Sequence, residues 1–145
     1  MDIGSRFEFI EGATSDLTFV ALGPTVEAAF VAAGQAFLAA TIEEPETVER
    51  RLHRSVVLEE PDLELLLLRF LNELVYLRDA EELLLHPDKL EIVWGDSVEL
   101  HAELSGERID RSRHTLASEV KAATAHSLRV GKTTDGWTAT ATLDV

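Results

Sequence analysis

Two stretches of the chain carry apolar residues at helical spacing. In each stretch the apolar positions recur every three or four residues, as they do on the buried face of an amphipathic helix. The first set comprises Val26, Ala29, Phe30, Ala33 and Phe37. The second set comprises Leu63, Leu66, Leu67, Phe70, Leu71, Leu74, Val75 and Leu77. The pattern predicts one helix that begins after the N-cap residue Thr25. It predicts a second helix that follows the acidic segment 59–62 and runs to about Arg78.

Shorter runs of apolar and β-branched residues, separated by turn residues, predict strands. The predicted strands cover 7–10, 17–22, 83–86, 90–94 and 98–104, with a turn at Pro87-Asp88 and a hairpin loop at Gly95-Asp96-Ser97. A further strand over 48–58, whose apolar alternation is incomplete, fits the edge of a sheet. The polar segment 105–113 predicts an exposed loop. The clearest hairpin lies within 114–145, where two runs rich in β-branched residues flank an Asp-Gly turn.

The order of these elements predicts the fold class. A strand pair, a helix, a strand, a second helix and then a series of hairpins is not the regular alternation of a doubly wound fold. We expect an α+β, two-layer fold in which two main helices pack on one face of a largely antiparallel or mixed β-sheet. At 145 residues, without repeats or a linker, the chain is expected to form a single domain over 1–145.

Composition narrows the class of function. The chain has no cysteine, which excludes disulfides, thiolate nucleophiles and thiolate metal sites. A net charge of −14, from 27 acidic and 13 basic residues, argues against tight direct binding of nucleic acid. The same charge suits docking on a basic partner, with solubility alone as the alternative. No apolar run has the length of a membrane span, and the first residues lack the pattern of a signal peptide, so a cytoplasmic protein is expected.

The end of the sequence places two carboxylates on adjacent residues. The side chain of Asp144 lies next to the α-carboxylate of Val145, at the end of a predicted strand. Two neighbouring anions repel each other unless a positive group lies between them, so this end of the chain predicts part of a cation site. The alternative is a frayed, solvated terminus.

Motifs over almost the whole chain resemble those of the archease family. The early motifs are Phe7-Glu8-Phe9-Ile10-Glu11, Asp16, Gly23 with Glu27-Ala28-Ala29-Phe30, and Leu71-Asn72-Glu73-Leu74. The later and more specific motifs are Asp110, Arg113-His114, Glu119-Val120-Lys121-Ala122, Thr124, His126 and the terminal Leu143-Asp144-Val145. Two motifs depart from the family pattern. The family's Glu-His-Thr-Ala-Asp is replaced by the longer segment 11–16 without its His, and Thr-Tyr-His is replaced by 124–126 without its Tyr.

The resemblance implies a function. Archeases are small α+β cytoplasmic proteins that act as cofactors of the RtcB-type RNA ligase, which joins 3′-phosphate to 5′-hydroxyl ends, notably in tRNA splicing. They promote guanylylation and turnover of the ligase and carry a divalent metal site. Carried over to this sequence, the metal ligands are Asp16, Asp144 and Val145. Because all three supply hard oxygen donors, the expected ion is Ca²⁺ or Mg²⁺.

Four further residues in the late motifs are candidates for a functional role. On a regular strand Glu119 and Lys121 share a face and can pair, whereas His126 lies on the other face unless a bulge shifts the register. His114 precedes this strand and could meet Glu119 only through a turn. For each histidine a purely structural role is the alternative.

Two other functions compete with an accessory role for an RNA ligase. One is a diverged interaction module that keeps the fold without the metal. The other, which is less favoured, is a small metal-dependent hydrolase. The sequence contains no nucleophile motif and no phosphate-binding glycine loop, so no catalytic residue is assigned and the protein is not expected to be an independent enzyme.

Overall fold

The computed structural model describes residues 4–10 and 16–145, which form seven strands, two α-helices and one short 3-10 helix. The strands are β1 (Arg6–Ile10), β2 (Asp16–Gly23), β3 (Leu52–Glu60), β4 (Leu83–Trp94), β5 (Val98–Arg108), β6 (Ala122–Thr133) and β7 (Gly136–Asp144). The helices are α1 (Val26–Thr41) and α2 (Leu63–Glu81), and the 3-10 helix is η1 (Pro45–Thr47). The predicted loop that precedes Asp16 lies outside the described residues.

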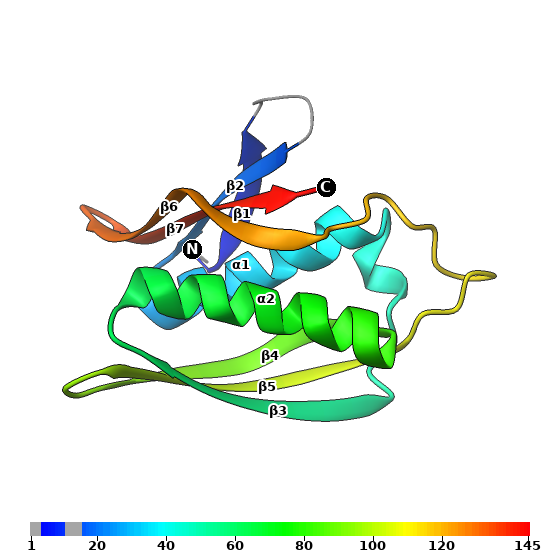
Figure 1. Cartoon of the computed structure of the whole chain (residues 1–145), viewed down its shortest axis with the longest axis horizontal. Helices are drawn as coiled ribbons and strands as arrows, with labels where there is room; N and C mark the ends of the chain where they lie inside the picture. The colour runs from blue at the N-terminus through cyan, green and yellow to red at the C-terminus, as the bar shows by residue number, and fades with distance from the viewer. Residues whose placement is uncertain (1–3, 11–15) are drawn as a thin grey trace.

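The strands form two antiparallel sheets with both helices between them. The first sheet has the order β1-β2-β7-β6 and the second the order β3-β5-β4. Figure 1 shows the sheets as outer layers, with α1 and α2 side by side in the middle. Helix α1 contacts β2 and β7 on one side and β4 on the other, and α2 contacts β6 and β3.

This arrangement confirms the predicted α+β class, with two main helices packed on antiparallel sheets. The strands divide into two sheets, so each helix is covered from two sides. The composition of α1 explains how it fits between them. Its buried residues cover most of the helix surface, and one face, with Glu27, Val31 and Gln35, is half-buried. Many of the buried residues are small: Ala29, Ala32, Ala33, Gly34, Ala36 and Ala40. A helix with such a broad apolar surface is stable only when other elements cover it from more than one side.

Side-chain caps fix where the helices begin. The Thr25 hydroxyl accepts a hydrogen bond from the Ala28 N–H (3.1 Å), as predicted for the N-cap of α1. The Asp62 carboxylate accepts one from the Leu65 N–H (2.8 Å) at the start of α2. Helix α2 continues to Glu81, beyond the predicted end. Within the described residues, neither helix combines the length and the apolar character needed to cross a membrane.

The predicted turn at Pro87-Asp88 is wrong, because β4 runs unbroken through it. The register of β4 against β5 shifts between Pro87 and Lys89, which marks a bulge. Strand β4 lies at an edge of its sheet, where a proline that cannot donate a hydrogen bond is tolerated. Pro87 is buried and packs near Gly34 of α1. A residue that signals a turn by its type is therefore part of the core here.

The prediction of an exposed loop over 105–113 is also wrong in its first part. Strand β5 extends to Arg108, and Ser105, Gly106 and Glu107 are buried. Gly106 lies so close to β4 that an added Cβ would be 1.8 Å from the carbonyl oxygen of Leu84. Glu107 can be buried because its charge is paired. The sequence pattern predicted a β5 that is too short, because its last residues do not show the usual apolar alternation. Close backbone contact at Gly106 and ion pairing at Glu107 stabilise this part of the strand instead.

Gly106 provides a direct test of this close approach. We expect Gly106→Ala to lower the free energy of unfolding by about 1–3 kcal/mol or more, because the new methyl group must push β4 away from β5. Gly95→Ala is the matched control, since its added Cβ would lie 3.7 Å from the nearest atom, the carbonyl oxygen of Ser97. Urea unfolding followed by circular dichroism measures both. Equal stabilities for the two variants would contradict the packing described for β5.

Candidate functional site

Asp16 and Asp144 lie opposite each other at one end of the first sheet. Asp16 begins β2, Asp144 ends β7, and the two residues are direct partners in the antiparallel register. Direct partners project from the same face with Cβ atoms about 4.5–5.5 Å apart. The next pair, Leu17 and Leu143, projects from the opposite face, where Leu143 is fully buried in the core. The two carboxylates therefore share the outer face of the sheet, and both residues are half-buried.

The residue after Asp144 is held against the protein. The Val145 side chain is half-buried and packs against the hydrophobic core, unlike that of a frayed end. Among the described residues, no three His, Cys, Asp or Glu side chains form a cluster that could hold a metal ion. A cation at the two aspartates would therefore need a further oxygen donor, the role that the sequence analysis assigned to the carboxylate of Val145.

The chemistry of the two aspartates fits a hard divalent cation. Like charges placed directly opposite on neighbouring strands destabilise a sheet. Within the described part of the chain, neither carboxylate accepts a hydrogen bond or pairs with a basic side chain. The adjacent pair on the same face, Thr18 and Thr142, brings two hydroxyl oxygens within 2.8 Å of each other. Carboxylate oxygens such as those of the two aspartates are ligands that Ca²⁺ and Mg²⁺ prefer.

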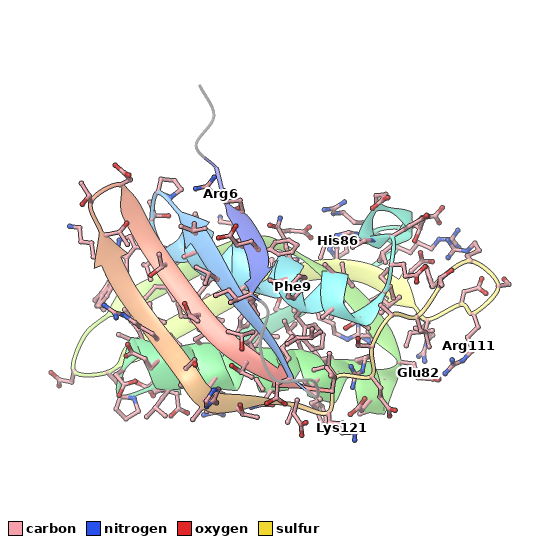
Figure 2. All side chains as sticks on the ribbon, turned by 90° about the horizontal axis from the view of Figure 1, so that it is seen from above. Arg6, Phe9, Glu82, His86, Arg111 and Lys121 are labelled. Carbon is pink, nitrogen blue, oxygen red and sulfur yellow. The ribbon has the colours of Figure 1, made fainter. Side chains whose placement is uncertain are left out.

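The Glu119–Lys121 segment lies beside Asp144. The Lys121 N–H donates a 2.7 Å hydrogen bond to the Asp144 carbonyl, and Ala122 pairs with Asp144 in the sheet. Figure 2 shows Lys121 at this end of the first sheet. Glu119 and Lys121 are both exposed and both precede β6, and no ion pair joins the two among the described residues. The shared strand face expected for them is therefore absent.

His126 lies in an irregular part of β6. The register against β7 shifts between Thr124 and Arg129, and Ser127 has a positive φ of 57°. The simple face alternation expected for this strand therefore fails at the bulge, and His126 is exposed. Its main-chain N–H donates to the Thr124 hydroxyl at 3.4 Å. The structure does not bring His126 together with His114.

Side chains of α2 hold the outer edge of β6. The Asn72 side chain donates to the Ala123 carbonyl (3.1 Å) and accepts from the Ala123 N–H (2.9 Å), as a neighbouring strand would. The Glu64 carboxylate accepts from the Val130 N–H (3.0 Å). These bonds satisfy edge groups that would otherwise be open to another chain. They also fix the start of β6 against β7, next to the two aspartates.

His114 is buried and takes part in a different network. Its Nδ1 accepts a hydrogen bond from the Asp110 N–H (2.9 Å), so Nε2 carries the ring proton and donates to the Glu107 carboxylate (3.1 Å). Glu107 also accepts from the Glu49 N–H (2.7 Å) and pairs with Arg113. The network ties the connection between β5 and β6 to the body of the protein, and His114 does not meet Glu119.

The network controls the ionisation of Glu107. Burial by itself raises the pKa of this carboxyl, but the hydrogen bonds from the Glu49 N–H, Arg113 and His114 outweigh it and hold the pKa below its ordinary value of 4.5. Sequence reasoning missed Glu107, because it was assigned to an exposed loop. The available signal was its spacing of six and seven residues from Arg113 and His114, which can neutralise a buried carboxylate. Asn72 was missed too, although a polar residue inside a leucine-rich stripe invites a search for a partner.

The fold and the end of the first sheet together define a class of small α+β proteins with two helices between two antiparallel sheets. The model of the archease protein family matches residues 7–145. The protein archease of Methanosarcina mazei is 35% identical over 144 residues, which cover 98% of this chain and 97% of that protein. Protein archease of Pyrococcus furiosus is 34% identical over 134 residues, 91% of this chain and 94% of the relative. The chain belongs to the archease family.

Solved structures agree with this assignment. The solution structure of protein 1598 of Methanobacterium thermoautotrophicum superimposes with a TM-score of 0.83 at 28% identity, covering 99% of this chain and all of the other. The crystal structure of an archease from Thermotoga maritima, described as a possible chaperone, gives a TM-score of 0.61 over 94% of this chain and 95% of that one. At 14% identity this second likeness supports the fold alone. The predicted family resemblance is confirmed.

The lowered pKa of Glu107 predicts a particular acid dependence of stability. A carboxyl whose pKa is lower in the folded protein adds stability above its ordinary pKa, and this stability is lost as the pH falls through the folded value. We expect Glu107→Gln to cost roughly 1–3 kcal/mol at pH 7, because charged hydrogen bonds are lost. Below about pH 4.5 the difference from the wild type should shrink, since protonated Glu107 resembles glutamine.

Urea unfolding at a series of pH values measures this difference. Glu91→Gln is the matched control, because Glu91 is exposed on β4 and has no part in the network. The difference in free energy of unfolding between this control and the wild type should be small, and it should change little from pH 7 to the values below about pH 4.5 at which the Glu107→Gln difference shrinks. A Glu107→Gln cost that stays constant, or grows on acidification, would contradict the paired, buried carboxylate.

Proposed function

We propose that this chain is an accessory protein that activates an RtcB-type RNA ligase, promoting guanylylation and turnover through a divalent-metal site at Asp16, Asp144 and Val145. The observation that carries the proposal is the direct register of Asp16 with Asp144 in a chain of the archease family. Asp16 and Asp144 are 128 positions apart in sequence, and the pairing of β2 with β7 brings them to one face at one end of the sheet. The exposed Glu119 and Lys121, beside this pair, are part of the proposed contact surface.

The chain's own residues would bind and orient the ion. Asp16 and Asp144 supply one carboxylate each from neighbouring strands, and the α-carboxylate of Val145 supplies the third. The bound ion would neutralise the repulsion between the aspartates and leave its open positions for oxygen atoms of the partner. A shared ion of this kind joins two acidic or phosphate-bearing surfaces that would otherwise repel each other.

The charge of the whole chain supports an accessory role. A net charge of −14 favours rapid encounter with a basic protein surface and disfavours independent binding of RNA. The large hollows of the described structure are open to solvent, whereas a small-molecule enzyme usually encloses most of its substrate. A metal-dependent hydrolase is therefore the weaker alternative, and a metal-free interaction module is the stronger one.

The metal site predicts opposite effects of one substitution with and without the ion. Without metal, we expect Asp144→Asn to leave stability unchanged or to raise it by about 0.2–1 kcal/mol, since it removes a like-charge pair. With Ca²⁺, Mg²⁺ or Mn²⁺ in roughly hundredfold excess over the dissociation constant, the wild type should gain about 2.7 kcal/mol and the variant should gain far less. Thermal unfolding and titration calorimetry measure both effects.

Extending the chain provides the control for the α-carboxylate. One glycine after Val145 moves that carboxylate by up to ~3.6 Å and leaves every side chain in place. Metal affinity should fall sharply, while Val145→Ile, which keeps the carboxylate, should bind as the wild type does. Flat titrations of the wild-type protein with all three ions would favour the metal-free module.

Ligase activation is tested directly with the purified protein and an RtcB-type ligase. Adding wild-type protein should raise the number of ligation turnovers per ligase molecule, and Asp16→Asn or Asp144→Asn should return turnover to the level without added protein. Glu91→Gln, on the opposite sheet, should activate as the wild type does. No stimulation by the wild type would overturn the proposed function.

A further inference from the structure

A hollow of about 480 Å³ lies where both helices end, beside the connection between β5 and β6. Its volume falls within the range of about 300–1,000 Å³ that is usual for ligand sites. The lining residues come from α1 and α2, the α2 cap and the connection 109–119; those used below are Arg78, Asp79, Glu82, Ile109, Leu116 and Glu119. Figure 2 shows Glu82 and Arg111, which also lines the hollow, near each other at this end of the molecule.

Arg78 in the wall of the hollow has an incomplete set of hydrogen bonds. Only 9% of its side chain is exposed. Its Nε and Nη2 donate to the Asp79 carboxylate at 3.0 and 2.8 Å, and Nη2 also donates to the Val120 carbonyl. Its Cζ lies 5.9 Å from the centroid of the Phe37 ring. Nη1 is buried and has no hydrogen-bond partner within the described part of the chain.

The unpaired Nη1 donor of Arg78 would be stabilised by an oxygen atom that accepts its hydrogen bond. Buried donors in folded proteins almost always have an acceptor, and an unpaired one is unfavourable. The Arg78 charge is already balanced by Asp79, so a neutral carbonyl suits Nη1 better than a second carboxylate. Because neighbouring atoms cover Nη1, the guanidinium has to tilt toward the hollow to meet that carbonyl.

The rest of the hollow favours a positive group. Glu82 and Glu119 are exposed there, and neither has a hydrogen-bonded or ionic side-chain partner among the described residues. Helices α1 and α2 both direct their C-terminal ends, which carry partial negative charge, to this region. Arg111 is the one basic residue in the described lining whose side chain has no hydrogen-bonded or ionic partner. The aliphatic side chains of Ile109 and Leu116 add an apolar surface.

We propose that this hollow receives an arginine residue from a loop of a basic partner protein. The main-chain carbonyl of that residue accepts the hydrogen bond from Arg78 Nη1, its guanidinium pairs with Glu82 and Glu119, and its methylene groups cover Leu116. The net charge of −14 would steer such a partner to this surface. The inference rests on the proposed function only for the identity of the natural partner.

A capped peptide tests the hollow without a ligase or a metal. We would titrate acetyl-Gly-Arg-Gly-amide into the ¹⁵N-labelled protein, with the corresponding Leu and Glu peptides as controls. The arginine peptide should shift the amide signals of 78–82 and 116–119 in a saturable manner, and both control peptides should leave them largely unchanged. Absence of saturable shifts with the arginine peptide, or equal shifts with the Glu or Leu peptide, would overturn the proposal.

Substitutions then separate the two contacts. Glu82→Gln, which keeps the size of the side chain, should weaken arginine-peptide binding about three- to tenfold. Arg78→Met should weaken it to a similar degree, with circular dichroism confirming that the variant is folded. Glu91→Gln should bind as the wild type does. Unchanged affinity of Glu82→Gln would overturn the proposal even if Arg78→Met fails to fold.

The outcome is distinguishable from failure of the proposed function. If the peptide binds as described but the wild-type protein does not stimulate an RtcB-type ligase, the hollow is an arginine site and the partner is another protein. If the ligase is stimulated and Glu82→Gln binds both the ligase and the arginine peptide as tightly as the wild type, the proposed function stands and the present inference is wrong.

Discussion

The pairing of β2 with β7 is the interaction on which both the fold and the candidate site depend. It joins the early part of the chain to its last strand, with eight residue pairs from Asp16–Asp144 to Gly23–Trp137. On its inner face the ladder presents Phe19, Ala21, Ala139, Ala141 and Leu143 to the helices, all fully buried. On its outer face it presents the two aspartates. Because side chains alternate along a strand, one register determines both faces, and a slip of one residue would bury the carboxylates and expose the core.

This coupling explains how a like-charge pair can persist in the sheet. The repulsion between Asp16 and Asp144 costs a fraction of a kcal/mol to about 1 kcal/mol, whereas burying one large apolar side chain contributes about 1.5–3 kcal/mol. Burial of the apolar face therefore determines the register, and this register places the two carboxylates opposite each other despite their repulsion. Because the register already places the two carboxylates opposite each other, binding of the proposed ion would need little rearrangement of the sheet and would relieve their repulsion.

Most of the fold follows from the sequence, but its division into two sheets does not. The helix stripes, the cap at Thr25, the acidic start of α2 at 59–62 and the hairpin turns are local signals, and local patterns identify them. The errors occur where long-range contacts override local preference. Pro87 lies within β4 because an edge strand tolerates a bulge, and Glu107 lies within β5 because Arg113 and His114 neutralise it. Asp16 and Asp144 were linked by family resemblance; spacing alone could not have paired residues so far apart.

Helix α2 connects the core to the surface that a partner would meet. Its apolar face packs between the sheets, while Asn72 and Arg78 bind the main chain at Ala123 and Val120. The segment between these contacts contains Lys121, whose N–H is bonded to Asp144. The aspartate pair and the hollow beside Arg78 are therefore fixed by the same few hydrogen bonds. A partner loop that draws the Arg78 guanidinium toward the hollow would change its bond to Val120, two residues from Ala122 and its pairing with Asp144. The two surfaces therefore share the main-chain segment 120–122, which contacts Arg78 at one end and Asp144 at the other.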